Sequence, residues 1–298
     1  MRKVEFWLVS TDHLEDRLLF RDVEDFTVGM NIVAVQANKR HVKVLVFILM
    51  SNHLHFVLLC TREEAEAFVN GCKLEFSRYL HKKYGCSEHL RRNGVDIRLI
   101  PQENEALERA LAYVQMNCVA ANICGSPRDY PWGTGACFFT GPVGGLPDVQ
   151  ANAGRPLAGF SARERFRLLH SKADVPGTWV MSDAGYVLPS SYVRKDLVEG
   201  VFRSPMRMNY FLRSSSKARL RLEIGEQSLP AFKDQVMAAA LPDLCWSLYR
   251  KGTVGELSEE QLVELLRQLR FRFSASVSQV ARVTGLSYER VAAFLDRV

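Results

Sequence analysis

Two histidines spaced two positions apart have the clearest chemical potential in this sequence. His53 and His55 flank Leu54, and the run continues as Phe-Val-Leu-Leu. Because strand side chains alternate between faces, positions i and i+2 project to the same face. Two imidazoles set side by side form a two-ligand clamp for a divalent metal. The alternative is one satisfied structural histidine and one chance neighbour, and a metal site would need a third ligand from elsewhere.

Tyr113 and Asn117 form a second pair with chemical potential. They lie four positions apart in a segment with helical spacing, so they share one helix face. A phenol and a carboxamide could supply a nucleophile and a metal ligand or phosphate donor. Free tyrosine has a pKa of about 10, so it needs a nearby base or a metal-polarised phosphate. The alternative is a core tyrosine with a capping asparagine, and Tyr79, Tyr84 and Tyr130 compete for the nucleophilic role.

The elements that must position these residues are strands and helices in mixed order. Strand patterns cover 4–10, 42–50, 53–60 and 95–100, and helical patterns cover 22–37, 62–84 and 103–122. The apolar, β-branched run at 42–50 is typical of a central strand. With 53–60 it predicts a hairpin or a bent pair in one sheet. This order predicts an α+β fold for about the first 130 residues.

Glycines and prolines concentrate between positions 131 and 157, which indicates a domain boundary. Helical patterns return at 161–171, 192–201, 229–250 and 258–270, whereas 171–191 has no clear pattern. We therefore predict four parts: a domain at 1–135, a linker at 136–157, a mostly α-helical region at 158–270, and a helix-turn-helix-like end at 271–298.

The C-terminal end has the spacing of a helix-turn-helix. A short helix at 278–283 precedes a turn at 284–286 and a second helix at 288–297, for which Ser287 is the expected N-cap. Small Ala281 lets the two helices approach closely. The alternative is two packed helices without DNA contact. If the motif binds DNA, the expected contacts come from Arg282, Tyr288 and Arg290.

Charge and composition narrow the class of protein. The 298 residues include 39 Lys and Arg against 33 Asp and Glu, a net charge of +6, which permits a nucleic-acid partner without requiring one. No apolar run of about 18 residues is present, and no signal peptide is recognisable, so we expect no membrane span. Seven cysteines without a C-x-x-C spacing argue against a disulfide framework or a thiolate zinc site and favour a cytoplasmic protein.

Three segments in order resemble the HUH-type single-tyrosine transposases, most closely the REP-associated tyrosine transposases. The run 50–59 (MSNHLHFVLL) resembles their "MPNHvHlll" signature, 111–122 (LAYVQMNCVAAN) their "rYih-NPvRAg" helix, and 127–133 (PRDYPWG) their "P-x-dYpws" segment. The run 19–22 (LFRD) also fits the family's early "lF-x-d". The resemblance covers about residues 4–135, and the rest of the chain is a C-terminal extension.

This resemblance implies a ferredoxin-like α+β domain with a central antiparallel sheet. It implies Mg2+ or Mn2+ held by His53, His55 and Asn117, and Tyr113 as the nucleophile on a phosphate of single-stranded DNA that contains a hairpin. The products would be a 5′-phosphotyrosine and a free 3′-OH. We expect a cytoplasmic, nucleoid-associated protein of a bacterium. Whether a single chain cleaves the DNA or a homodimer does so across its two chains is open.

Four positions depart from the family pattern. Ser51 and Cys118 replace prolines, and Ala120 and Asn122 replace an arginine and a glycine. Without the proline, the tyrosine helix could run on without a bend and move Tyr113 relative to the metal. The missing arginine could weaken the grip on DNA.

Basic residues near these motifs are the expected contacts to the DNA backbone, although a charge run is more often a solvated face. The expected contacts are Lys73, Arg78, Lys82, Lys83, Arg91 and Arg92. A later region is also locally basic, so a second DNA contact there is conceivable. It contains Lys195, Arg203, Arg207 and Arg213.

Three functions remain open. The first is a transposase-like nuclease with a tyrosine nucleophile. The second is a domesticated, non-catalytic DNA-binding or regulatory protein, which the changes at Cys118 and Ala120 favour. The third is a small-molecule metal hydrolase built on the histidine pair, which would need more carboxylate or histidine ligands than the neighbouring motifs offer.

Overall fold

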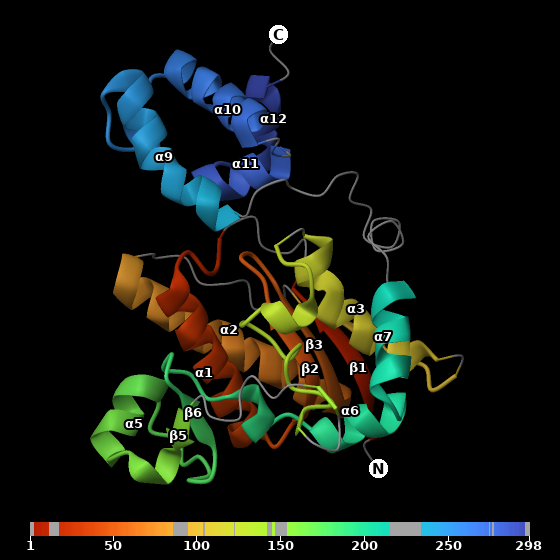
Figure 1. The fold of residues 1–298 in the computed structure, drawn as a ribbon. Coiled ribbons are helices and arrows are strands. Elements are labelled where there is room, and N and C mark those ends of the chain that lie inside the picture. Colours follow the sequence, from red (N-terminus) through yellow and green to blue (C-terminus); the bar gives the residue numbers. More distant parts are fainter. Residues whose placement is uncertain are drawn as a thin grey trace.

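A four-stranded antiparallel sheet with helices on both faces organises the larger part of the chain (Figure 1). The computed structural model describes residues 3–11, 18–85, 95–103, 105–121, 123–141, 145–146, 154–214, 234–273, 275 and 277–295. The strands are β1 (Glu5–Ser10), β2 (Lys43–Leu49), β3 (Leu54–Cys60) and β4 (Asp96–Leu99), in the order β2-β3-β1-β4. The predicted α+β class is confirmed, and the predicted hairpin is the β2–β3 pair.

Helices α1 (Val23–Arg40) and α2 (Arg62–Tyr84) cover one face of this sheet. Phe56 of β3 meets Phe68 of α2 with ring centroids 5.2 Å apart. Helix α2 begins with a capping box, in which Thr61 and Glu64 each accept a hydrogen bond from the other's backbone amide. It ends at Gly85, whose φ of 65° is the left-handed conformation that glycine adopts without strain.

Helix α3 (Ala106–Ala120) packs on the opposite face, against β2 and β3, and α6 (Lys195–Phe202) and α7 (Pro205–Ser214) pack beside it. The side chains of β1 show that the two faces of the sheet differ in burial. Trp7 and Val9 are buried under α1 and α2, whereas Phe6, Leu8 and Ser10 on the α3 side are half-buried. The sheet is therefore partly open beside α3.

The middle of the chain joins the same body. Strands β5 (Gly154–Pro156) and β6 (Val180–Ser182) form a small sheet that lies with α5 (Ala162–Leu169) against α1. Buried Asn31 of α1 donates to the carbonyls of Leu168 and Gly185 and accepts from the amide of Val187, at 2.9–3.0 Å. The predicted linker also takes part in the main core, because Cys137 and Phe138 are buried there. Single 3-10 turns occur at Pro127–Asp129, Leu157–Gly159, Pro189–Ser191 and Val254–Glu256.

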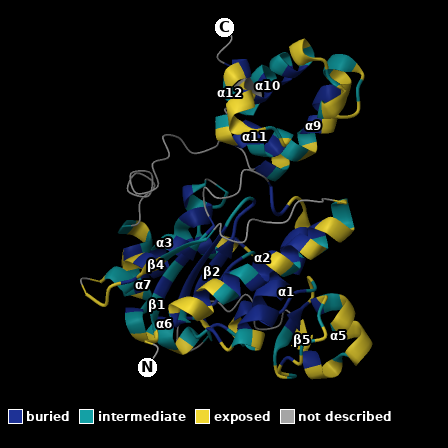
Figure 2. Cartoon of the chain, turned by 180° about the vertical axis from the view of Figure 1, so that it is seen from behind, coloured by how far each residue is buried: buried dark blue, intermediate teal, exposed yellow. Residues whose placement is uncertain are grey.

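A second, smaller core belongs to the C-terminal helices. Helices α9 (Asp234–Tyr249), α10 (Glu259–Phe273), α11 (Val277–Thr284) and α12 (Tyr288–Leu295) enclose it (Figure 2). Leu265 of α10 and Val280 and Val291 of the last two helices are all fully buried. The boundary predicted between 270 and 271 therefore falls inside one packing unit.

The last two helices and the turn between them lie where the sequence predicts two short helices joined by a turn. Ala281 is 2% exposed where α11 meets α12, and Gly285 has a φ of 73° in the turn between them. Ser287 caps α12, since its hydroxyl accepts from the amide of Arg290 at 3.2 Å. Among the described helices, none combines the length and apolar composition that crossing a membrane requires.

A buried carboxylate ties α1 to α2. Asp25 is fully buried and accepts from the hydroxyls of Tyr79 (2.8 Å) and Tyr84 (3.0 Å) and from Nζ of Lys83 (2.8 Å). Lys83 also binds Asp22 at 2.8 Å. Partial burial alone would raise the pKa of Asp22, but the hydrogen bond and charge of Lys83 and the backbone amide of Asp25 outweigh it and lower that pKa.

We expect Lys83→Met to lower the free energy of unfolding at neutral pH by about 2 kcal/mol, because the buried carboxylate of Asp25 loses its cation. Urea unfolding measures this. The folded-state pKa of Asp22 lies below its ordinary 3.8, so its contribution is present above that pH and is lost in more acidic solution. The difference in the free energy of unfolding between wild type and Lys83→Met should therefore become smaller in acidic solution. The neighbouring Lys82→Met, on an exposed residue, is the control, and an equal loss in both variants would contradict the expectation.

Candidate functional site

Strand β3 and the turn before it bring the two histidines together. His55 lies between β1 and β2, opposite Ser10 and Ile48, and is 1% exposed. The ring centroids of His53 and His55 are 4.8 Å apart and the rings are nearly perpendicular, at 86°. Phe56 points to the other face, toward α2. The alternation along the strand thus places His55 on the side of the sheet that α3 covers, and His53, just before the strand, lies next to it.

Helix α3 places Tyr113 against this pair. The ring of Tyr113 lies 5.6 Å from that of His55, edge to face at 85°, and the side chain is half-buried. The helix continues through Cys118 to Ala120, as expected where the family pattern has a proline that this chain lacks. A phenol and two imidazoles from separate elements therefore meet at one place.

Asn117 lies one turn beyond Tyr113 and is 6% exposed. Its Nδ2 donates to the carbonyl of Tyr113 at 2.9 Å, so Oδ1 is the atom that could serve as a ligand. On the histidine side, Nδ1 of His53 lies 2.9 Å from Oδ1 of Asn52. Because an amide oxygen only accepts, Nδ1 carries the proton and Nε2 is the nitrogen whose lone pair could bind a metal.

The competing tyrosines are engaged in other contacts. Tyr79 and Tyr84 donate to Asp25, and Tyr130 donates to the carbonyl of Leu49 at 2.8 Å. Burial raises the pKa of Tyr84 to about 12, and it also raises the pKa values of Tyr79 and Tyr130. A higher pKa makes the phenolate harder to form, so these three hydroxyls are poor nucleophiles.

The residue types at the site fit a restricted set of metals. Among the described residues, no cluster of three or more His, Cys, Asp or Glu side chains could hold a metal ion. The resemblance implies two imidazoles and the amide oxygen of Asn117 as the ligands of a metal here. Imidazole nitrogens suit Mn2+ better than Mg2+, which prefers oxygen. Two nitrogens and one oxygen would leave positions for water and phosphate oxygens.

The C-terminal helices hold the loop that precedes His53. The carbonyl of Ser51 accepts from the amides of Leu19 and Phe20 at 2.8 and 3.0 Å. The Ser51 hydroxyl donates to Oδ2 of Asp234, at the start of α9, at 3.2 Å. The loop is thus fixed from two sides.

Asp234 is the centre of this contact. It is 5% exposed and also accepts from Nε2 of Gln279 at 2.9 Å and from Nε of Arg282 at 3.1 Å. Sequence reasoning missed Asp234. The one signal was Ser51, which brings a hydroxyl to a position where the family pattern has proline.

The expected DNA contacts separate into engaged and exposed residues. Lys73, an expected contact to the DNA backbone, is 2% exposed and shares the inward side of α2 with Val69 and Phe76, so it does not lie at the surface. The charge of Lys83 is neutralised by the carboxylates of α1 and its cap. Arg282 is paired with Asp234. These three residues serve the fold.

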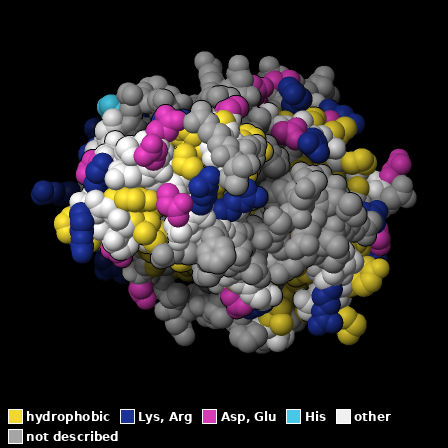
Figure 3. All heavy atoms as spheres, turned by 90° about the horizontal axis from the view of Figure 1, so that it is seen from above, with side chains coloured by type: hydrophobic (Ala, Val, Ile, Leu, Met, Phe, Trp, Pro, Cys, Tyr) yellow, Lys and Arg dark blue, Asp and Glu magenta, His cyan; other side chains and the backbone are white. Residues whose placement is uncertain are grey.

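The remaining candidates lie at the surface or outside the described residues. Lys82 is exposed, and Arg78 is exposed but paired with Glu75 at 2.8 Å. Tyr288 is 48% exposed, and exposed Arg290 has its guanidinium 5.4 Å from the ring centroid of Phe294. Arg91 and Arg92 lie outside the described residues. In the view of the molecule from above, Lys and Arg side chains are interspersed with Asp and Glu among the described residues (Figure 3).

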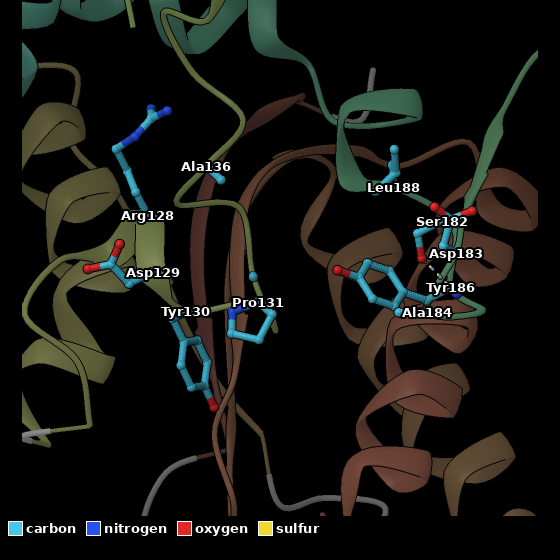
Figure 4. A pocket seen from close by; sticks show the side chains of 11 residues that line it. Arg128, Asp129, Tyr130, Pro131, Ala136, Ser182, Asp183, Ala184, Tyr186 and Leu188 are labelled. Atoms are coloured by element: carbon cyan, nitrogen blue, oxygen red, sulfur yellow. Dashed lines mark hydrogen bonds between the residues drawn. The ribbon is translucent and has the colours of Figure 1, made fainter. Parts of the chain in front are cut away.

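A pocket of about 330 Å³ lies between the segment 128–136 and the hairpin 182–188 (Figure 4). Tyr130 and Tyr186 contribute to its walls, and the Ser182 hydroxyl accepts from the amide of Tyr186 at 3.2 Å. The residues that line this pocket include tyrosines but no histidine. We therefore take the cluster of His53, His55 and Tyr113 as the candidate site.

Comparisons with family models, curated proteins and solved structures found no significant match to this chain. The candidate site therefore rests on residue types and their geometry.

We expect Asp234→Ala to loosen both segments that this carboxylate joins. The guanidinium of Arg282 and the hydroxyl of Ser51 lose their acceptor, at a cost of about 2 kcal/mol for a charged hydrogen-bonded group. Hydrogen exchange should become faster in 49–55 and 277–284. The matched control is Asp243→Ala, an exposed carboxylate on the same helix. Equal exchange in the two variants would show that Asp234 does not hold the loop.

Proposed function

We propose that this chain cleaves and rejoins single-stranded DNA through a covalent 5′-phosphotyrosine on Tyr113, assisted by Mn2+ or Mg2+ at His53 and His55. The observation that carries this proposal is the close approach of three rings. The ring centroids of His53 and His55 are 4.8 Å apart, and those of His55 and Tyr113 are 5.6 Å apart. The connection order β1-α1-β2-β3-α2-β4 and the strand order β2-β3-β1-β4 support the ferredoxin-like topology that the resemblance implies.

The partly open face of the sheet along β1 and β4 is further support for the proposal, because it offers a surface for a DNA strand beside the site. Ser10 lies directly across from His55, and Phe6 and Leu8 continue the same half-buried face along β1. At the edge strand, Arg98 pairs with Leu8 in register and is 72% exposed, where it forms an ion pair with Asp96. Arg98 was not singled out from the sequence. An aromatic ring and an arginine on an open sheet are suited to bases and phosphates.

The reaction would be a transesterification. The hydroxyl oxygen of Tyr113 attacks the phosphorus in line, the bond from phosphorus to O3′ breaks, and a phosphotyrosine bond forms. The phenol loses its proton and the departing O3′ gains one. The step needs no ATP, because the phosphotyrosine bond that forms keeps the energy of the phosphodiester bond that breaks. His53, His55 and Asn117 would hold the metal, which when bound polarises a non-bridging phosphate oxygen. A 3′-OH of another strand can reverse the step.

A DNA-binding protein without catalysis is the second candidate. The surface of α12 supports it, because Tyr288 and Arg290 are exposed at the start of the second helix of a helix-turn-helix shape. In this function the transposase-like body serves as a scaffold. The two functions differ in one product, because a protein–DNA adduct that survives denaturing electrophoresis is formed only by the enzyme.

We expect Tyr113→Phe to abolish that adduct on a hairpin-bearing single-stranded oligonucleotide with Mn2+, because the nucleophilic oxygen is gone, while DNA affinity changes by no more than about twofold. Denaturing electrophoresis and fluorescence anisotropy measure the two quantities. Tyr249→Phe, in the C-terminal helices, is the control and should form the adduct normally. An adduct in Tyr113→Phe would remove Tyr113 from the role.

We expect the double variant His53→Ala/His55→Ala to lose both cleavage and Mn2+ binding, the latter by at least about tenfold, because both imidazole ligands are gone. Electron paramagnetic resonance of Mn2+ measures binding without DNA. His81→Ala, an exposed histidine on α2, should behave as wild type. Unchanged Mn2+ affinity in the double variant would refute the metal clamp.

A further inference from the structure

Helix α7 presents a set of exposed side chains that the proposed reaction does not use. Met206, Asn209, Tyr210 and Arg213 follow the spacing i, i+3, i+4 and i+7, so they share one helix face. Met206 is 82% exposed and Tyr210 65%. Together with Ser214 they line a hollow of about 690 Å³. A thioether, an amide, a phenol ring and a guanidinium are thus gathered at one surface.

The opposite face of α7 is firmly packed. Met208 and Phe211 are buried in the main core, and the ring of Phe211 lies 5.9 Å from that of Phe202 in α6. The outward direction of Tyr210 is therefore set by the packing of its neighbours. Two large side chains, Met206 and Tyr210, are thus held in solvent by a helix that is anchored on its other face.

The charge around this face favours an anionic partner. The segment 194–214 contains five Lys and Arg and two Asp and Glu, a net charge of 5 − 2 = +3. Arg194, Lys195 and Arg207 each form an ion pair with a carboxylate. Arg203 and Arg213 are exposed, and no ion pair within the described part of the chain engages them. Within the described residues, these two guanidinium groups are therefore the cations of 194–214 that remain for a ligand.

The position of α7 connects this face to the tyrosine. Arg207 pairs with Glu105 and Glu108, at 2.9 and 3.1 Å, which fixes α7 beside the first turn of α3. Glu108 is five residues before Tyr113, about 7.5 Å along the helix axis at 1.5 Å per residue. Helix α7 also lies on the α3 side of the sheet, near β4 (Figures 1 and 2). A strand bound at the site could continue over α7.

We infer that the outward face of α7 is a binding site for single-stranded nucleic acid, with a base stacked on Tyr210 and phosphates bound by Arg203 and Arg213. Stacking on an aromatic ring is tolerant of sequence, since every base has a π-face. The inference extends the proposed function, on which it rests for the direction of the strand toward Tyr113.

The test measures binding by the full chain in a Tyr113→Phe background without metal, so that no cleavage occurs. The probe is a fluorescent oligothymidylate of about 12 nucleotides, followed by anisotropy. Tyr210→Ala should weaken binding by about fivefold or more, whereas Tyr210→Phe, which keeps the ring, should restore it. Arg213→Gln should reduce the slope of log K against log salt by about 0.7, the value for one phosphate contact to a single strand.

The controls are an exposed ring and an exposed cation elsewhere, Phe166→Ala on α5 and Lys39→Gln on α1, and both should bind as the background does. Equal affinity of Tyr210→Ala and Tyr210→Phe would overturn the inference. So would a Tyr210→Ala protein that binds DNA normally but changes its sedimentation, since the face would then contact another copy of the chain.

The same variants distinguish this inference from the proposed function. If the protein with Tyr113 intact forms no covalent adduct but Tyr210→Ala still weakens binding, the nucleic-acid site stands and the cleavage chemistry fails. If the adduct forms and Tyr210→Ala has no effect on affinity, the cleavage chemistry stands and the α7 site is overturned.

Discussion

The alternation of side chains along β3 is the constraint on which the candidate site depends. One strand serves two layers: Phe56 completes the apolar packing under α2, while His55 faces α3. A shift of register by one residue would exchange these faces, placing an imidazole in the apolar layer and a phenyl ring beside Tyr113. The apolar packing on one side therefore secures the polar arrangement on the other, because neither can change without the other.

The second organising contact joins the two cores. Asp234 stands at the start of α9, yet its carboxylate binds Ser51 in the loop before the histidines and Arg282 in α11. A buried carboxylate needs such partners, since an uncompensated charge in the interior is costly. The C-terminal helices are thus attached to the loop that precedes the histidines.

Several of the cations pair with carboxylates that hold the fold together, so only the others remain to bind a ligand. Lys83 satisfies Asp25, Arg282 satisfies Asp234, and Arg207 links α7 to α3. Each of these cations sits opposite a carboxylate far away in sequence. The cations that remain at the surface, among them Arg203 and Arg213, are therefore more informative about partners than the net charge of +6.

The sequence by itself determined the features that depend on near neighbours: the pairing of His53 with His55, the Ser287 cap of α12, and the turn between the last two helices. Strand alternation and caps act within about four residues, so a local pattern carries them. Only the tertiary structure decided that Tyr113 reaches His55, that Asp234 holds Ser51 from 183 positions away, and that Lys73 is buried. The physical reason is that burial and ion pairing are set by which distant segments the fold brings together, and no local pattern encodes that.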